Sequence, residues 1–312
     1  MKNYFSKEKN YQDISMGFKQ TFHHTPSKKV DVTSLIRKKI ESDEQISDFD
    51  LEIIKIIDSM KFLTAEMVAD VLGEDKDKVE RRLSKLVRNK VINSFLLSSI
   101  KYVNRSEIPD DAEYIYTMDY AGSVLIDKFI INKFEEWQCK DAALNPISIG
   151  KILISNELFV KVKKSVGEKI KSYIVAPEYP IDKYMMASDF EMTLTKDTEN
   201  DKIFLGEVIN NSYDRYNVIK TLEKFENFIA TESYTKVYKA GTVEPIFIFI
   251  CEDEDVLEDI SNILEGLFPK IKLYRLTTIE RLKGDIGGAE AFLKYDRNIG
   301  GLKASGIKMF KK

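Results

Sequence analysis

The apolar positions of the chain follow a helical spacing up to about residue 90 and a strand-like spacing in much of the second half. A first helix is predicted from Asp48, because apolar residues then recur every three or four positions. These residues are Leu51, Ile54, Ile57 and Met60. A second helix is predicted between Thr64, an N-cap residue type, and Gly73, a residue type that ends helices.

A third helix is predicted after Asp75, and residues 91–103 and 112–119 then carry the branched and aromatic side chains typical of strands. The apolar stripe of this third helix has to pack on the first two helices. Its members are Val79, Leu83, Leu86 and Val87. Three helices followed by a two-stranded ribbon predict a winged helix-turn-helix domain over residues 48–135.

The second half is predicted to form an α/β domain over residues 145–283, with the element order αβββαβαβ. The first three strands are expected within residues 172–178, 186–195 and 201–210, and the last two within residues 244–252 and 271–278. The sequence thus predicts an α+β protein of two domains. Residues 1–47 are expected to be a flexible basic arm, and residues 284–312, which lack clear periodicity, a tail.

The composition of the 312 residues, 43% hydrophobic and 32% charged, is typical of a globular protein that can bury two cores. No apolar run is long enough for a bilayer span or a signal peptide, so a cytoplasmic protein without a membrane partner is expected. Cys139 and Cys251 are far apart, and the adjacent His23 and His24 lack the spacing of metal ligands. No metal site and no resident cofactor are therefore predicted.

The predicted third helix and the segment after it are strongly basic, although the whole chain carries a net charge of −3. Residues 76–105 contain nine Lys and Arg against two acidic residues, a local balance of +7. At 100° per residue, four helix cations face away from the apolar stripe and Arg82 lies on its flank. The outward face is thus expected to be nearly all positive, and the resulting repulsion favours an anionic partner.

In a helix-turn-helix, the second helix of the motif enters the major groove of DNA and reads base edges, while nearby cations pair with phosphates. The basic helix stands in that place. The candidate DNA contacts are Lys78, Arg81, Arg82, Lys85 and Arg88 on the helix, with Lys101 and Arg105 in the ribbon. Arg81 is the expected guanine reader. The alternative is a solvated basic helix in a domain that binds protein.

Two carboxylates, Asp189 and Glu207, fall on successive predicted strands joined by a polar turn. Antiparallel strands can bring such a pair to one edge of a sheet, where it can hold a divalent metal. Glu191 falls on the same strand face as Asp189 by the two-residue period, and is expected to face solvent rather than to act as a third ligand.

The order of helix, three strands, helix and strand, with acids on the second and third strands, is similar to the core of restriction-endonuclease-like nucleases. Those enzymes typically carry a Lys two residues after the second acid, where this chain has Ile209. The second domain is therefore expected to be non-catalytic. Asp189 and Glu207 remain catalytic and metal candidates only for a nuclease that uses Mg²⁺.

Several segments resemble, in order and spacing, those of the replication-relaxation family of bacterial plasmid and mobile-element proteins. In the first half they are "FLTAEMVADVLG", "VERRLSKLVRNKVI" and "YIYTMDYAGSVLI". In the second half they include "ASDFEMTL", "FLGEVINNSYDRYNVIKTLEKFENFI" and "EPIFIFICE". The resemblance runs from about residue 48 to 283. The chain has Glu207-Val208-Ile209-Asn210 where the family commonly shows Glu-Val-Asp-Arg.

The resemblance implies a sequence-specific protein that binds double-stranded DNA of a plasmid or mobile element and acts in replication or DNA transfer. It implies a winged helix followed by a degenerate restriction-endonuclease-like domain that serves dimerisation or contact with a replication or relaxase protein. The residues leave two alternatives open. One is a metal-dependent nuclease that uses Asp189 and Glu207, and the other is a transcriptional regulator of the element's own genes.

Overall fold

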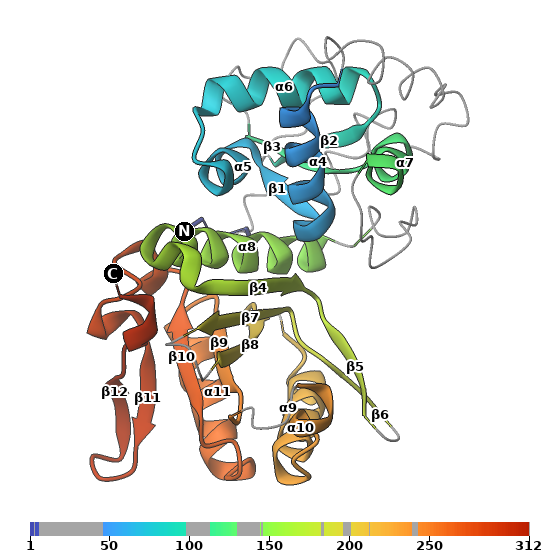
Figure 1. The fold of residues 1–312 in the computed structure, drawn as a ribbon. Helices are drawn as coiled ribbons and strands as arrows, with labels where there is room; N and C mark the ends of the chain where they lie inside the picture. Colours follow the sequence, from blue (N-terminus) through green and yellow to red (C-terminus); the bar gives the residue numbers. More distant parts are fainter. Residues whose placement is uncertain are drawn as a thin grey trace. The chain divides into compact units, whose positions relative to one another are not determined.

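The computed structural model is an α+β protein with helices and a mixed sheet (Figure 1). It forms two compact units, Ser6–Leu153 and Met1–Phe5 with Ile154–Lys312. The structure describes residues 1–2, 4–5, 46–97, 113–129, 144, 146–181, 184–195, 201–211, 213–238 and 243–311. Most of the predicted arm, residues 6–45, lies outside this part. Among the described residues, no helix has both the length and the apolarity needed to cross a bilayer.

The described helices of the first unit are α4 (Asp48–Met60), α5 (Ala65–Leu72), α6 (Lys76–Arg88) and α7 (Tyr120–Phe129). The first three begin after an N-cap residue whose side chain accepts a backbone N–H. Thr64 caps α5 by accepting the Met67 N–H, and Gly73 ends it with a left-handed φ of 68°. Asp75 caps α6 through the Lys78 N–H. These three predictions are confirmed.

A three-stranded antiparallel sheet completes the first unit, in the order β1-β3-β2. Its strands are β1 (Phe62–Thr64), β2 (Ile92–Leu97) and β3 (Glu113–Met118). The β2–β3 pair lies within the predicted ribbon. Strand β1 was not predicted, because three residues are too few to show an alternating pattern. Ile54, Leu83 and Leu86 of the helices are fully buried, and the rings of Phe62 and Phe95 pack edge to face in the same unit.

The second unit is built on a seven-stranded mixed sheet in the order β12-β11-β10-β9-β8-β7-β4. Its strands are β4 (Ile170–Val175), β7 (Phe190–Thr195), β8 (Asp201–Ile209), β9 (Ile246–Cys251), β10 (Tyr274–Thr278), β11 (Leu293–Asp296) and β12 (Gly301–Ala304). Strands β8, β9 and β10 are parallel neighbours, and the other pairs are antiparallel.

The sheet is accompanied by helices and by a separate two-stranded hairpin. The helices are α8 (Pro146–Val166), which belongs to this unit from Ile154 on, α9 (Arg215–Ala230), α10 (Tyr234–Val237) and α11 (Glu254–Leu267). The hairpin strands are β5 (Glu178–Ile181) and β6 (Tyr184–Ala187). Short 3-10 turns span Gly167–Lys169, Arg281–Lys283, Ala289–Ala291 and Lys308–Phe310.

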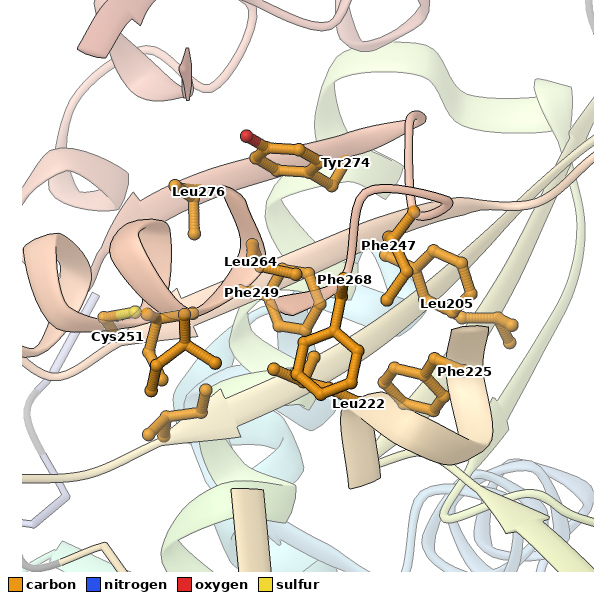
Figure 2. Packing of buried hydrophobic residues seen from close by; sticks show 14 of the residues in the cluster. Leu205, Leu222, Phe225, Phe247, Phe249, Cys251, Leu264, Phe268, Tyr274 and Leu276 are labelled. Atoms are coloured by element: carbon orange, nitrogen blue, oxygen red, sulfur yellow. The ribbon is translucent and has the colours of Figure 1, made fainter. Parts of the chain in front are cut away.

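Phenylalanine and aliphatic side chains of β8, β9 and β10 meet those of α9 and α11 in the core on one face of the sheet (Figure 2). Phe225 of α9 stacks on Phe247 of β9, with ring centroids 4.8 Å apart. On the other face, Phe204 of β8 packs against Phe310, whose carbonyl accepts a hydrogen bond from Ser165 of α8. The central strand β9 is therefore buried on both faces, which explains its nearly continuous apolar run.

Three boundaries differ from those predicted by the sequence. The predicted strand 186–195 is two strands, β6 and β7, that belong to different sheets and part at Ser188 and Asp189. The predicted tail is wrong, because β11 and β12 extend the main sheet beyond β10. The predicted arm is not uniformly free either, since Tyr4 is buried with the second unit and only 1% exposed.

Gly206 allows β7 and β8 to pair closely, since a Cβ at this position would overlap the ring of Phe190, the residue opposite it. We expect Gly206→Ala to lower the free energy of unfolding by about 1–3 kcal/mol, as overpacking of a core does. Gly266→Ala is the matched control. It lies in α11 with nothing within 4 Å of the new methyl group, and should be neutral or stabilising by up to about 1 kcal/mol. Urea unfolding followed by circular dichroism measures both, and equal effects would contradict the packing argument.

Candidate nucleic-acid interface

Helix α6 divides its surface between a buried stripe and an open polar face. Val79, Leu83 and Leu86 of the predicted stripe are fully buried, whereas its fourth member, Val87, is only half-buried. The outward face lines an open hollow of about 700 Å³. The residues that line it are Asp75, Asp77, Glu80, Arg81, Ser84 and Arg88.

Arg81 and Arg88 are the exposed cations of this hollow. The Nε of Arg81 donates to the backbone carbonyl of Asp77 at 3.2 Å, which lays the side chain along the helix surface. Within the described ranges, neither guanidinium forms an ion pair with a carboxylate. Both groups therefore keep donors that point to solvent and can bind an external acceptor.

The two lysines of the candidate set differ from these arginines. Lys78 pairs with Glu74 at 2.8 Å, and its ammonium lies 4.4 Å from the centre of the Phe49 ring. Both partners of the ion pair are substantially exposed, so the pair is weak and open to exchange. Lys85 is half-buried.

The expectation of a nearly all-positive outward face is wrong for the first two turns of α6. Asp77 and Glu80 share the hollow with Arg81, and Glu80 lies 3.4 Å from the ammonium of Lys76. The sequence analysis missed this, because it assigned only the cations to helix faces and counted Asp77 and Glu80 in the total charge alone. The hollow is mixed in charge, so it offers acceptors as well as donors.

Arg82 has a structural partner instead of an open surface. Its Nε donates to Oδ1 of Asp50 at 2.7 Å, and a terminal nitrogen bonds both the other Asp50 oxygen and the Ser47 hydroxyl. Asp50 is completely buried. The hydrogen bonding that Arg82 donates to the Asp50 carboxylate raises the pKa of Arg82 above its usual value. We therefore leave Arg82 out of the exposed DNA-contact set. Lys101 and Arg105 lie outside the described residues.

Asp189 and Glu207 lie next to each other in the register of the antiparallel strands β7 and β8. The β7–β8 register pairs Phe190 with Gly206, so the next positions along it are Asp189 and Glu207. Asp189 lies just before β7, and its carboxylate accepts the backbone N–H of Val208 at 2.7 Å. The Asp189 side chain thereby satisfies a backbone N–H of β8 that lies beyond the last β7–β8 residue pair. This hydrogen bond gives Asp189 a structural role.

Glu191 does not face solvent, contrary to the expectation from the two-residue period. It is 4% exposed and accepts hydrogen bonds from the hydroxyls of Tyr179 and Tyr238, the second at 2.7 Å. The hairpin, β7 and the segment after α10 thus meet at one carboxylate. Burial raises the pKa of both tyrosines above the ordinary value, so their hydroxyls stay protonated and donate.

Residues that can hold a metal do not gather in the described parts of the chain, where no cluster of three or more His, Cys, Asp or Glu has suitable geometry. Cys251 is buried at the end of β9, and burial raises the pKa of its thiol. His23, His24 and Cys139 lie outside the described residues. A metal site at Asp189 and Glu207 would therefore need further ligands, such as water or substrate oxygens.

Sequence reasoning missed Ser47, Asp50, Tyr179 and Tyr238. The first two form a capping box, and the "SDFD" spacing at 47–50 is a signal that predicts one. No local signal marks the tyrosines, because their common partner is distant in the chain.

Comparison of the chain with protein-family models, with curated proteins and with solved structures found no match.

The tyrosine pair around Glu191 makes a prediction about stability. Glu191→Ala removes the common acceptor and leaves two hydroxyls unsatisfied, at about 1–3 kcal/mol for each buried group, so unfolding should become easier by at least about 2 kcal/mol. Glu178→Ala, an exposed carboxylate on the same hairpin, should change stability by less than about 0.5 kcal/mol. Chemical unfolding followed by circular dichroism tests both, and a neutral Glu191→Ala would refute the structural role.

Proposed function

We propose that this protein binds double-stranded DNA in a sequence-specific manner, through a winged helix-turn-helix in its first unit with α6 as the recognition helix. The observation that carries the proposal is the pair of exposed guanidinium groups, Arg81 and Arg88, on one face of α6 without carboxylate partners in the described ranges. Arginine is the residue that most often reads guanine, by a bidentate contact to O6 and N7.

The spacing of the two arginines suits the major groove. Seven residues separate them, which is two helical turns or about 10 Å along the axis of α6. The groove is about 12 Å wide and admits one α-helix, so a helix lying in it can bring the two side chains to base pairs about three steps apart. The order α4, α5, α6, β2, β3 is that of a winged helix, and this order supports the assignment.

The acids of the hollow give the proposed interface a second kind of contact. Asp77 and Glu80 can accept a hydrogen bond from the N4 amino group of cytosine, whereas they repel phosphates. Lys78 and Lys85 flank the hollow and would anchor the phosphate backbone. The proposed DNA site therefore contains G·C pairs where α6 enters the groove.

The wider role that we propose follows from the resemblance to the replication-relaxation family. The protein would act in the cytoplasm on a plasmid or mobile element, in replication or DNA transfer. The second unit would contact a second copy of the chain or a replication or relaxase protein. A transcriptional regulator would bind its own promoter instead of an origin, so the location of the best-bound DNA distinguishes the two roles.

Binding of labelled duplexes tiled across the DNA that flanks the gene tests this proposal. Fluorescence anisotropy should find one tile that binds far more tightly than the others, with log affinity falling by about 0.9 per phosphate contact for each tenfold rise in salt. Arg81→Ala should weaken binding to that tile by about 1–3 kcal/mol, and Arg88→Ala similarly.

Arg297→Ala is the matched control, because Arg297 is an exposed arginine of the second unit, 72% exposed and ion-paired with Glu265. This variant should bind the best tile like the wild type. Equal binding of all tiles, or binding indifferent to Arg81 and Arg88, would overturn the proposal and favour a protein-facing helix.

The same duplexes test the nuclease alternative, which is supported by the positions of Asp189 and Glu207 directly next to the Phe190–Gly206 pair of the β7–β8 register. We expect no cleavage of the best-bound tile on incubation with Mg²⁺, because Ile209 stands where a charge-stabilising Lys is needed. Cleavage that Glu207→Gln abolishes without loss of DNA binding would establish the nuclease instead. Glu207 is the better probe, because Asp189 also has a structural hydrogen bond.

A further inference from the structure

Asp50 lies where the start of α4 meets the middle of α6, and its carboxylate serves both helices. Its Oδ2 accepts the backbone N–H of Ser47 at 2.8 Å and the Ser47 hydroxyl at 3.0 Å, which closes the capping box of α4. Both oxygens also accept from Arg82. A single buried carboxylate thus fixes the N-terminus of one helix and a side chain of the other.

The ion pair between Asp50 and Arg82 is largely removed from solvent. Asp50 is 0% exposed and the side chain of Arg82 is 26% exposed. Removing such charges from water is unfavourable, and apolar residues of similar volume often stabilise a core equally well. A buried ion pair is better explained by the orientation that it imposes, and in this case it constrains α6.

The geometry of a guanidinium makes this constraint strict. The planar fork bonds a carboxylate through two parallel donors, which fixes both the direction and the rotation of the side chain. Arg82 leaves α6 only 100° around the axis from Arg81. A rotation of α6 that kept its apolar stripe partly buried would therefore break the Arg82 contact and would also turn Arg81 out of the hollow.

We propose that Arg82 and Asp50 form a positioning pair that sets the rotation of α6 about its axis, so that Arg81 and Arg88 are presented together to the DNA. This inference rests on the proposed function. It assigns Arg82 an indirect role, in place of the phosphate contact that its charge predicts. Ser47, which bonds both members of the pair, belongs to the same network.

The direction in which Asp50→Asn changes the affinity for DNA distinguishes a positioning role of Arg82 from a phosphate contact. Asp50→Asn removes a negative charge from a domain that binds a polyanion, and it releases Arg82. If Arg82 contacted a phosphate, DNA would then bind equally or more tightly. If the pair positions α6, binding to the best tile should fall at least tenfold, while binding to an unrelated duplex of the same length stays within about twofold.

Two further variants complete the experiment. Arg82→Lys keeps the charge but loses the fork, so a positioning role predicts the same loss of specificity, whereas a phosphate contact predicts nearly normal binding at an unchanged salt slope. Glu74→Gln is the control for removal of an acid, since Glu74 pairs with Lys78 at the surface just before α6. This control should bind the best tile equally or more tightly.

Anisotropy titrations should be made below the unfolding temperature of each variant, which circular dichroism establishes. If Asp50→Asn does not fold, Arg82→Lys gives the decisive comparison. Normal specificity of folded Asp50→Asn or of Arg82→Lys would overturn the positioning role and leave the proposed function intact. A wild-type protein that binds no duplex would overturn the proposed function and this inference with it.

Discussion

A buried carboxylate has to find hydrogen-bond donors inside the protein. In the described part of each unit, such a carboxylate lies where separate segments meet. In the first unit Asp50 joins the N-terminus of α4 to Arg82 of α6. In the second unit Glu191 joins β7 to Tyr179 of the hairpin and to Tyr238 after α10. Apolar packing holds these segments together, but it tolerates small rotations and shifts. The two carboxylates fix the orientation of these segments, because their hydrogen-bond donors must stay in place.

The elements that the sequence predicts well are those whose causes are local. The caps at Thr64, Asp75 and Gly73 depend on one residue and its immediate neighbours, and the structure has them as predicted. The buried stripe of α6 follows equally from a period of 3.6 residues. Both faces of a central parallel strand are buried, so the apolar run before Cys251 also predicted β9 correctly. The α+β class follows from the sum of these local signals.

The errors arise where the deciding partner is distant in the chain. The two-residue period assigns Glu191 a direction, but it carries no information about Tyr238, which lies 47 residues away. Arg82 looks like another surface cation until its buried partner, 32 residues earlier, is known. The strands β11 and β12 have four residues each, and they form because an open sheet edge at β10 offers backbone partners. Such strands leave little pattern of their own. Of the candidate interface, the sequence could therefore predict the helix and its cations, but not which cation is structural.

The acids on the outward face of α6 bear on the kind of binding that this surface favours. A purely cationic face gains affinity from any duplex, because phosphates are the same in every sequence. Asp77 and Glu80 reduce that general attraction, and a site without suitable base-pair donors would leave them facing DNA unpaired. Arg81 and Arg88 gain most from guanine acceptors, and the acids gain most from the amino group of cytosine. A face with both charges therefore lowers the affinity for random DNA more than the affinity for a matched site. It also requires a fixed rotation of α6 about its axis, because a rotation by 100°, the angle between neighbouring residues, would place acceptors where donors are needed.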